Sequence, residues 1–273
     1  MVRKIRFLLV PAAVLLAGAL AAPAGAASTD NPHTAPVQGL QRVSPHHSTS
    51  SNWSGYAVTG ATFQAASGSW TQPAVTCPTS KSQYASFWVG IDGDNSSTVE
   101  QIGTDSDCIN GQPTYYAWYE MYPAAPVNLT AHQMPVSPGG TFTATVQYAN
   151  GAFTLSLTNG TTTFTTTPLA GTPARSSAEW IAEAPSVGGH VLPLADFGSV
   201  SFSGASATDS NENSGTISDT AWNDDAITLV QKGLTATPGT LASKGSAFTV
   251  VVSTSGGGSG GGHGGHGNPH GSW

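Results

Sequence analysis

Short runs of strand-forming residues, separated by Gly, Pro, Asn and Ser, recur along most of this 273-residue chain. Runs of this kind, at intervals of roughly 8–12 residues, are typical of an antiparallel sandwich or barrel. No long helical period interrupts them, so the sequence predicts one all-β domain over residues 51–254. Strands are expected at residues 52–59, 62–72, 83–91, 98–103, 114–122, 141–149, 153–158, 161–167, 178–184, 199–203, 227–230 and 247–254.

The clearest alternation of apolar and polar residues lies in the middle of the chain. Phe142, Ala144 and Val146 alternate with threonine and glutamine, so they are expected to share one face of a strand and enter the core. Asn150 and Gly151 follow, and then a second alternating run begins. Because Asn-Gly favours the tight turn of a hairpin, the two runs are expected to pair.

The two ends of the chain differ in composition from this domain. Residues 1–27 have basic residues, an apolar stretch shorter than the ~20 residues of a membrane span, and small residues at the end. They are interpreted as a signal peptide, so the mature protein is expected to be secreted, extracellular and not membrane-bound. Residues 28–50 are expected to form a disordered leader or short propeptide, and residues 255–273 a flexible Gly/His-rich tail.

Because the protein is expected to be secreted, the redox state of its two cysteines can be predicted. An even number of cysteines in an oxidising compartment predicts a disulfide between Cys77 and Cys108. It would close a loop of about 30 residues, which on the chain-entropy model stabilises the fold by about 3 kcal/mol. A cysteine nucleophile or a thiolate metal site is not expected.

Charge excludes some classes of partner. The chain has fifteen acidic residues, and few basic residues remain after the signal peptide. Nucleic acid and anionic membranes are therefore not expected to bind. A low charged fraction also leaves few ion pairs for acid to break, which favours tolerance of low pH. The remaining basic residues are Arg42, Lys81, Arg175, Lys232 and Lys244.

Several common hydrolase motifs are missing from the sequence. There is no Gly-x-Ser-x-Gly, His-Glu-x-x-His or Cys-x-x-Cys segment, and no pair of Asp-Thr-Gly or Asp-Ser-Gly segments. The only histidines of the expected domain, His132 and His190, have no recognisable triad context. Neither a metal nor another cofactor is expected, which leaves carboxylates that act without histidine as the candidates.

Two stretches carry such side chains. On the expected strand 178–184, alternation places Glu179 and Glu183 on one face with Ile181. Carboxylates on an apolar strand cost free energy unless they are partnered or solvated, so at least one is expected in a cleft. On the expected strand 98–103, Glu100 and Gln101 point to opposite faces, and Gln101 is the one expected to face a pocket.

An aromatic run at residues 115–122 is bulky on both faces. Such a strand, buried on one side, can present a stacking or peptide-binding surface on the other. Tyr116, Trp118, Glu120 and Tyr122 share one face of the run. Together with Trp53, Trp88 and Trp180, they are candidates for the lining of a groove.

Five segments occur in the order and approximate spacing found in the glutamic peptidases (eqolisins, peptidase family G1), which the chain resembles over residues 51–254. These segments are FWVGIDGD, EQIGTDSDC, YYAWYEMYP, AEWIAEAP and LADFGSVSF, and the start Asn52-Trp53-Ser54-Gly55 is also similar. The resemblance implies a jelly-roll-like sandwich of two curved antiparallel sheets with a concave substrate groove. It further implies an acid-active endopeptidase of polypeptides that uses a Gln–Glu pair and no metal.

Matching the motifs residue by residue assigns roles to this sequence. The family glutamine falls on Gln101, and the family glutamate falls on Glu183 rather than Glu179. Glu183 would act as general base and acid on water, and the Gln101 amide would stabilise the tetrahedral intermediate. Residues implied in substrate binding or in support of the pair are Trp88, Trp53, Asp92, Asp105, Glu120 and Trp118.

Other functions fit parts of the pattern. The same sandwich with an aromatic surface is compatible with a lectin-like carbohydrate-binding module without catalysis. A glycosidase that uses Glu179 and Glu183 fits poorly, because residues four apart on a strand are separated by about 13 Å.

The leader is shorter and poorer in Lys than those of the fungal peptidases, which argues against inhibition by the leader. A monomer is expected.

Overall fold

The computed structural model describes residues 32, 34–169 and 171–254. The predicted signal peptide and the Gly/His-rich tail lie outside these residues. The regular secondary structure of the described residues is almost entirely β-strand, and the one helix among them is a single 3-10 turn, η1 (Ser243–Gly245). This confirms the all-β class expected from the spacing of the strand-forming runs.

One sheet carries the residues of interest and is called the groove sheet. Its neighbouring strands pair antiparallel in the order β17–β3–β12–β5–β6–β7–β8. The strands are β3 (Trp53–Thr59), β5 (Ser86–Ile91), β6 (Val99–Ile109), β7 (Gln112–Tyr122), β8 (Val127–Asn128), β12 (Ser177–Glu183) and β17 (Asn223–Gln231).

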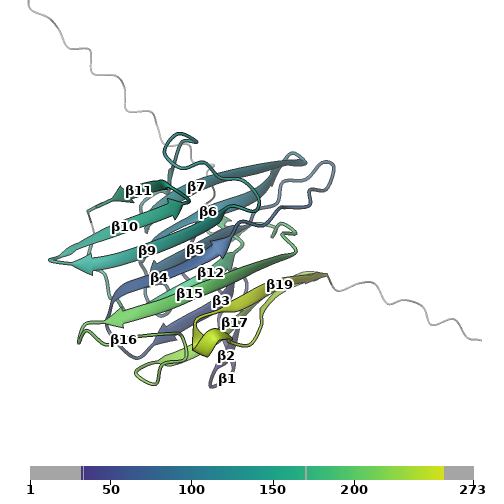
Figure 1. Cartoon of the computed structure of the whole chain (residues 1–273). Coiled ribbons are helices and arrows are strands. Elements are labelled where there is room, and N and C mark those ends of the chain that lie inside the picture. The colour runs from purple at the N-terminus through teal and green to yellow at the C-terminus, as the bar shows by residue number, and fades with distance from the viewer. Residues whose placement is uncertain (1–31, 33, 170, 255–273) are drawn as a thin grey trace, which may run out of the picture.

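The second sheet has the order β11–β10–β9–β4–β15–β19. Figure 1 shows β10, β9, β4 and β15 in front of β6, β5, β12 and β3, as the two layers of a sandwich. One strand, β18, pairs with both β17 and β19 and so joins the layers at one side. The strands are β4 (Phe63–Thr71), β9 (Thr141–Ala149), β10 (Ala152–Asn159), β11 (Thr162–Thr166), β15 (Ser199–Asp209), β18 (Leu234–Pro238) and β19 (Phe248–Thr254).

Short strands complete the fold at its margins. A two-residue strand, β16 (Ser214–Gly215), pairs with β15, and β13 (Ser186–Val187) and β14 (His190–Val191) form a separate ribbon. All twelve strands expected from the sequence are present, with ends that differ by several residues in β6, β15 and β17. The Asn150-Gly151 hairpin is also confirmed: both residues have positive φ, and Ala149 pairs with Ala152.

Alternation decides which side chains enter the core between the layers. Phe142, Ala144 and Val146 of β9 are buried there, as the sequence predicts, against the inward side chains of β5, β6 and β12. The opposite face of the groove sheet carries a second apolar cluster, which we call the groove face. It comprises Trp53, Ala57, Trp88, Val99, Trp118, Ile181 and Ile227.

The predicted disulfide is confirmed. Cys77 and Cys108 are bonded, with their Cα atoms 5.4 Å apart. Cys108 lies on β6, so the bond fixes the loop before β5 to the strand that carries Gln101.

The leader differs from the expected disordered segment. Residues 34–50, called the leader segment from here on, contain β1 (Gln41–Ser44) and β2 (His47–Ser50), which form a hairpin. The reason is that β17 has a free edge, and β2 adds to it in parallel, with His47 beside Ala226 and Ser50 beside Leu229. Backbone hydrogen bonds of this kind do not depend on apolar alternation, so the pattern of the sequence gives no sign of them.

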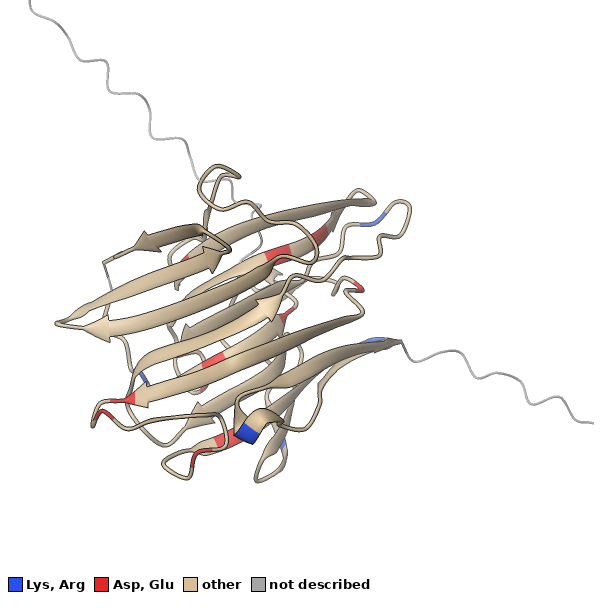
Figure 2. Cartoon of the chain, in the orientation of Figure 1, with Lys and Arg blue, Asp and Glu red and all other residues tan. Residues whose placement is uncertain are grey.

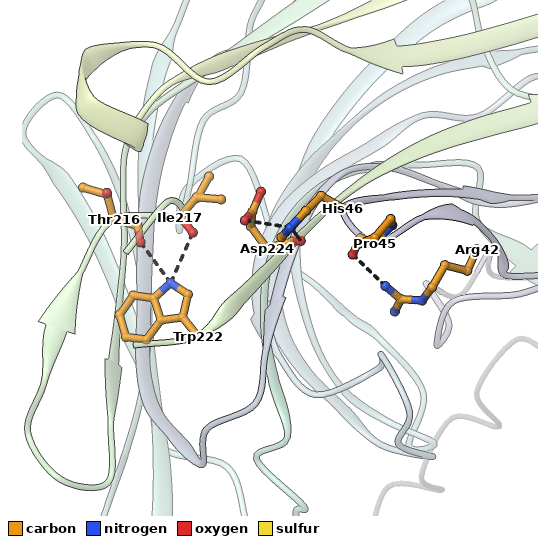
Figure 3. Close-up of polar contacts among 7 residues, drawn as sticks. All are labelled: Arg42, Pro45, His46, Thr216, Ile217, Trp222 and Asp224. Atoms are coloured by element: carbon orange, nitrogen blue, oxygen red, sulfur yellow. Dashed lines mark hydrogen bonds and ion pairs between the residues drawn. The ribbon is translucent and has the colours of Figure 1, made fainter. Parts of the chain in front are cut away.

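The turn of the leader hairpin is held by two polar contacts (Figure 3). Arg42 donates a hydrogen bond to the Pro45 carbonyl over 3.0 Å. The Nδ1 atom of His46 lies 3.3 Å from an Asp224 carboxylate oxygen. Asp224 is on β17, so this contact fixes the hairpin to the same strand with which β2 pairs.

Lys and Arg residues are sparse along the folded domain (Figure 2). Those in view lie in connections and at strand ends rather than across the sheets. Within residues 32, 34–169 and 171–254, no helix is long and apolar enough to cross a membrane. The same residues contain no cluster of three His, Cys, Asp or Glu side chains with the geometry of a metal site.

Candidate active site

Gln101 lies in the middle of the groove sheet. On β6 it pairs with Gly90 of β5 on one side and with Glu120 of β7 on the other. A Cβ atom at Gly90 would lie 2.8 Å from the Trp88 ring and 3.2 Å from the Gln101 Cβ. The glycine therefore leaves the space in which the indole and the Gln101 side chain lie together.

Glu183 is at the end of β12, between β3 and β5. Its Oε1 accepts hydrogen bonds from the Ala35 amide over 3.0 Å and from Asn52 Nδ2 over 3.1 Å. Its Oε2 accepts from Trp88 Nε1 over 2.9 Å. Three N–H donors therefore surround a carboxyl group that has no solvent exposure.

Burial raises the pKa of Glu183 well above its usual range. The hydrogen bonds from Ala35, Asn52 and Trp88 lower this pKa, and the charge of Glu120 raises it further. Desolvation is the largest of these effects. A carboxyl group with a raised pKa can take up a proton and return it in moderately acid solution.

Two tryptophans form the floor beside Glu183. The rings of Trp53 and Trp88 meet edge to face with their centroids 5.0 Å apart. Trp88 directs its N–H to Glu183, whereas Trp53 Nε1 donates to the Ala35 carbonyl over 2.9 Å. Both tryptophans therefore lie on the groove face beside Glu183.

Gln101 contacts the residue that precedes Ala35. Its Nε2 donates to the Thr34 hydroxyl over 2.5 Å and lies 3.4 Å from Glu120 Oε2. The Thr34 hydroxyl in turn donates to Glu120. Gln101 and Glu183 therefore contact two consecutive residues of one chain segment, and both side chains are fully buried beneath it.

The leader segment continues along the groove face after Ala35. The Val37 amide donates to the Gly93 carbonyl over 3.2 Å, and the Gln38 amide donates to Asn52 Oδ1 over 2.7 Å. A cavity of about 210 Å³ lies beside Ala35 and Gln38. The groove is thus wider than the segment that lies in it.

A group of acids lies beside the pair, toward the end of β6. Trp118 Nε1 donates to Asp105 over 2.5 Å, and the Tyr116 hydroxyl donates to Asp107 over 2.9 Å. Burial raises the pKa of Asp105 to about 7, and burial together with the charge of Asp105 also raises the pKa of Asp107. Because these acids are neutral at low pH, the groove is least charged in acid.

Two residues that the sequence associates with the groove have other surroundings in the structure. Asp92 was expected in the groove or in support of the pair. Its carboxylate accepts hydrogen bonds from the Arg175 and Ser176 amides and so holds the chain that enters β12. Trp180 was a candidate for the groove lining, yet it is buried in the core between the layers. Its neighbours on β12 alternate with it, which is why Glu183 faces the groove.

Sequence reasoning assigned no role to three residues that contact the pair. Asn52 donates to Glu183, and Thr34 and Ala35 contact Gln101 and Glu183 directly. Asn52 lies in the Asn-Trp-Ser-Gly start already noted as a motif, so that position carried a signal. Nothing in the pattern of residues 34 and 35 marks them.

Glu179 shares the face of Glu183 but differs from it in environment. It is fully buried, and neither of its carboxyl oxygens has a hydrogen-bond partner within the described chain. Burial raises its pKa well above the usual range. The structure thus separates the two glutamates: one contacts several donors and the leader segment, and the other is enclosed.

The chain is similar in sequence to known peptidases. A model of the peptidase A4 family matches residues 51–251. Aspergillopepsin-2 of Aspergillus niger is 35% identical over 185 residues, which cover 58% of this chain and 64% of the relative. The chain therefore spans slightly less than two thirds of the length of that curated relative.

Solved structures give the same fold. The crystal structure of aspergilloglutamic peptidase from Aspergillus niger is 30% identical with a TM-score of 0.54, covering 62% of this chain and 98% of that one. Scytalido-glutamic peptidase with a transition state analog inhibitor has a TM-score of 0.62, covering 74% of this chain and 98% of that one. At 22% identity, the second likeness shows the fold alone.

Proposed function

The chain belongs to the peptidase A4 family, and from this premise we propose that it is a secreted, acid-active endopeptidase of glutamic type. Its substrates are polypeptides, and Glu183 with Gln101 forms the catalytic pair. The predicted signal peptide and the Cys77–Cys108 disulfide support export to an oxidising compartment.

One observation carries the proposal. Glu183 and Gln101 come from strands far apart in the sequence, yet each contacts one of two consecutive residues, Ala35 and Thr34, of the same segment. A peptide in this groove therefore has one peptide bond flanked by a carboxyl group and a carboxamide donor. That is the arrangement which hydrolysis of a peptide bond requires.

Glu183 takes the role of proton carrier. The fraction of Glu183 that is ionised removes a proton from the attacking water, and the resulting carboxyl group then gives that proton to the leaving amine nitrogen. The contact with the Ala35 N–H supports the second part, because Oε1 lies 3.0 Å from a peptide nitrogen. Asn52 and Trp88 hold the carboxyl group in this position through their N–H donors.

Gln101 takes the role of donor to the oxyanion. Its Nε2 lies 2.5 Å from an oxygen atom of the bound segment, within the reach needed for a developing negative charge. Glu120 lies beside it, and its Oε2 accepts hydrogen bonds from the Gln101 amide and from the Thr34 hydroxyl. We assign Glu120 to positioning the Gln101 amide, with its nitrogen directed into the groove.

Acid activity follows from the buried carboxyl groups. Glu179, Asp105 and Asp107 have raised pKa values because they are buried, so each is neutral in acid. As the pH rises through these pKa values, negative charge would gather at Asp105 and Asp107 beside the pair, and at the enclosed Glu179 of β12. We therefore expect the groove to lose its active geometry toward neutral pH.

Digestion of a denatured protein at pH 3 to 5 tests the proposal. Glu183→Gln and Gln101→Ala are each expected to lower kcat by about 100-fold or more, the size seen for loss of an oxyanion donor. The matched controls are Glu212→Gln and Gln147→Ala, which change exposed residues of the same types. Near-full activity in either groove variant would show that the pair is misassigned.

The same samples separate hydrolysis from carbohydrate binding. The lectin-like alternative predicts retention on a glycan column and no fragments at any pH. Fragments that appear with the parent protein and the control variants, and not with Glu183→Gln, would exclude it.

A further inference from the structure

We propose that the Ser86 hydroxyl connects Glu183 to Asp105 in one chain of hydrogen bonds, in which Asp105 holds the proton and Glu183 is the ionised member. Ser86 and Asp105 are then positioning residues, because they act on the reaction through Glu183. The consequence for activity rests on the proposed function. The ionisation of the two carboxyl groups does not, because it is measured without a substrate.

The register of the groove sheet places these three side chains in one row. Ser86 of β5 pairs with Glu183 of β12 on one side and with Asp105 of β6 on the other. Trp88 lies on the groove face, and Ser86, two residues before it on the same strand, shares that face. Residues directly opposite each other in an antiparallel pair have Cβ atoms about 5 Å apart. The serine is therefore the side chain that lies between the two carboxyl groups.

The Ser86 hydroxyl has hydrogen-bonding capacity to spare. Ser86 is 1% exposed, and its Oγ has no partner at hydrogen-bond distance within the described chain. A hydroxyl group can donate one hydrogen bond and accept two, and burying it with none of them costs about 1–3 kcal/mol. Burial raises the pKa of Asp105, and the nearby Tyr116 and Ser86 hydroxyl groups lower it, so Ser86 lies close to this carboxyl group. It can therefore accept from protonated Asp105 and donate to ionised Glu183.

A small polar cavity adjoins the serine on the side of Asp105. Its volume is about 10 Å³, and Ser86, Asp105, Thr34 and Tyr116 are among the residues that line it. A space of about this size holds one water molecule when it offers two or more polar partners. The chain from Ser86 to Asp105 can therefore close either directly or through one water molecule.

The surroundings of the two carboxyl groups decide which of them keeps the proton. Glu183 accepts hydrogen bonds from N–H groups at both of its oxygens, which favours its ionised form. Asp105 lies beside Asp107 and Glu120, and like charges disfavour its ionisation. Two nearby carboxyl groups in unequal surroundings share one proton in this way. The arrangement increases the fraction of Glu183 that is ionised, which is the form needed to activate water.

Ser86→Ala tests the chain through the pH–rate profile. Loss of a hydrogen bond to a charged group should move the acid limb of kcat/KM to higher pH by about one unit, which lowers kcat/KM about 10-fold below the limb. Ser86→Thr keeps the hydroxyl group and is expected to restore the position of the limb. The matched control is Ser203→Ala, which changes an exposed serine of β15 and should follow the parent.

Asp105→Asn tests the other end of the chain. The asparagine oxygen can still accept from Trp118, and its amide can donate to Ser86 at every pH. Because this donor no longer titrates, the upper limb of the pH–rate profile is expected to move to higher pH by about one unit. A purely structural role for Asp105 predicts a lower rate with both limbs in place, and that result would contradict the proposal.

Carbon-13 NMR of the carboxyl groups supplies a measurement that needs no catalysis. In a Gln101→Ala background, which prevents autolysis, Glu183 is expected to titrate at lower pH than Asp105. Adding Ser86→Ala should then raise the pKa of Glu183 by about one unit. The proposal is overturned if Glu183 titrates above Asp105, or if its titration is the same with and without the Ser86 hydroxyl. The expected titrations, together with no hydrolysis by the parent protein, would support the chain and refute the proposed function instead.

Discussion

Replacing Glu100 by Gln is predicted to remove much of the loss of stability that this protein undergoes as the pH rises. Glu100 lies on β6 with its side chain turned away from Gln101, and it is 3% exposed. Its Oε2 has no hydrogen-bond partner in the part of the chain that the structure describes. Burial, and then the charge of Asp92, raise its pKa from 4.5 to about 8.

The sign and size of the effect follow from this shift. Because the pKa of the folded state lies above that of the unfolded state, folding favours the protonated carboxyl group. The stabilisation is complete below about pH 4.5 and is lost as the pH rises toward 8. Between pH 4.5 and 7, about 2.5 pH units at about 1.4 kcal/mol each remove about 3 kcal/mol of unfolding free energy.

Urea unfolding followed by tryptophan fluorescence at pH 4 to 7 measures the effect. Both proteins carry Glu183→Gln, so that autolysis and the titration of Glu183 are absent from the comparison. The parent is expected to lose about 3 kcal/mol more than the Glu100→Gln variant over this range. The control Glu212→Gln, at an exposed position, should follow the parent. Equal losses in the parent and in Glu100→Gln would refute the reasoning.

Two further changes test the surroundings of the pair. Trp88→Phe removes an N–H donor that lowers the pKa of Glu183, so kcat/KM should fall about 10-fold and its acid limb should move to higher pH in a pH–rate profile. An unchanged acid limb would mean that Trp88 only packs. Removing the disulfide by changing Cys77 and Cys108 together to Ser should lower the free energy of unfolding by about 3 kcal/mol in urea, and a loss below about 1 kcal/mol would contradict the loop-closure estimate.

Period-two alternation was sufficient to decide which way the principal side chains point. It placed Gln101 opposite Glu100, and Glu183 with Ile181, and the structure has both arrangements. The strands, the Asn-Gly hairpin and the disulfide were also predictable. Each of these depends on a few neighbouring residues, or on a count of cysteines in a secreted chain.

Which strands lie side by side was decided only by the tertiary structure. Glu183 is 95 residues from Trp88 and 131 from Asn52, and no local pattern relates positions so distant. Asp92 shows the same limit, because its role depends on the chain that packs against it. Trp180 differs, because alternation with Glu183 along β12 already places it on the core face.

The leader segment is the clearest case. Its sequence is rich in Pro and polar residues and has no alternation, which locally favours disorder. It is ordered because β17 offers an unpaired edge and the groove offers donors and acceptors to Thr34 and Ala35. Those partners exist only once the sheet has formed, so the sequence determined the sheet, and the folded sheet determined what lies in its groove.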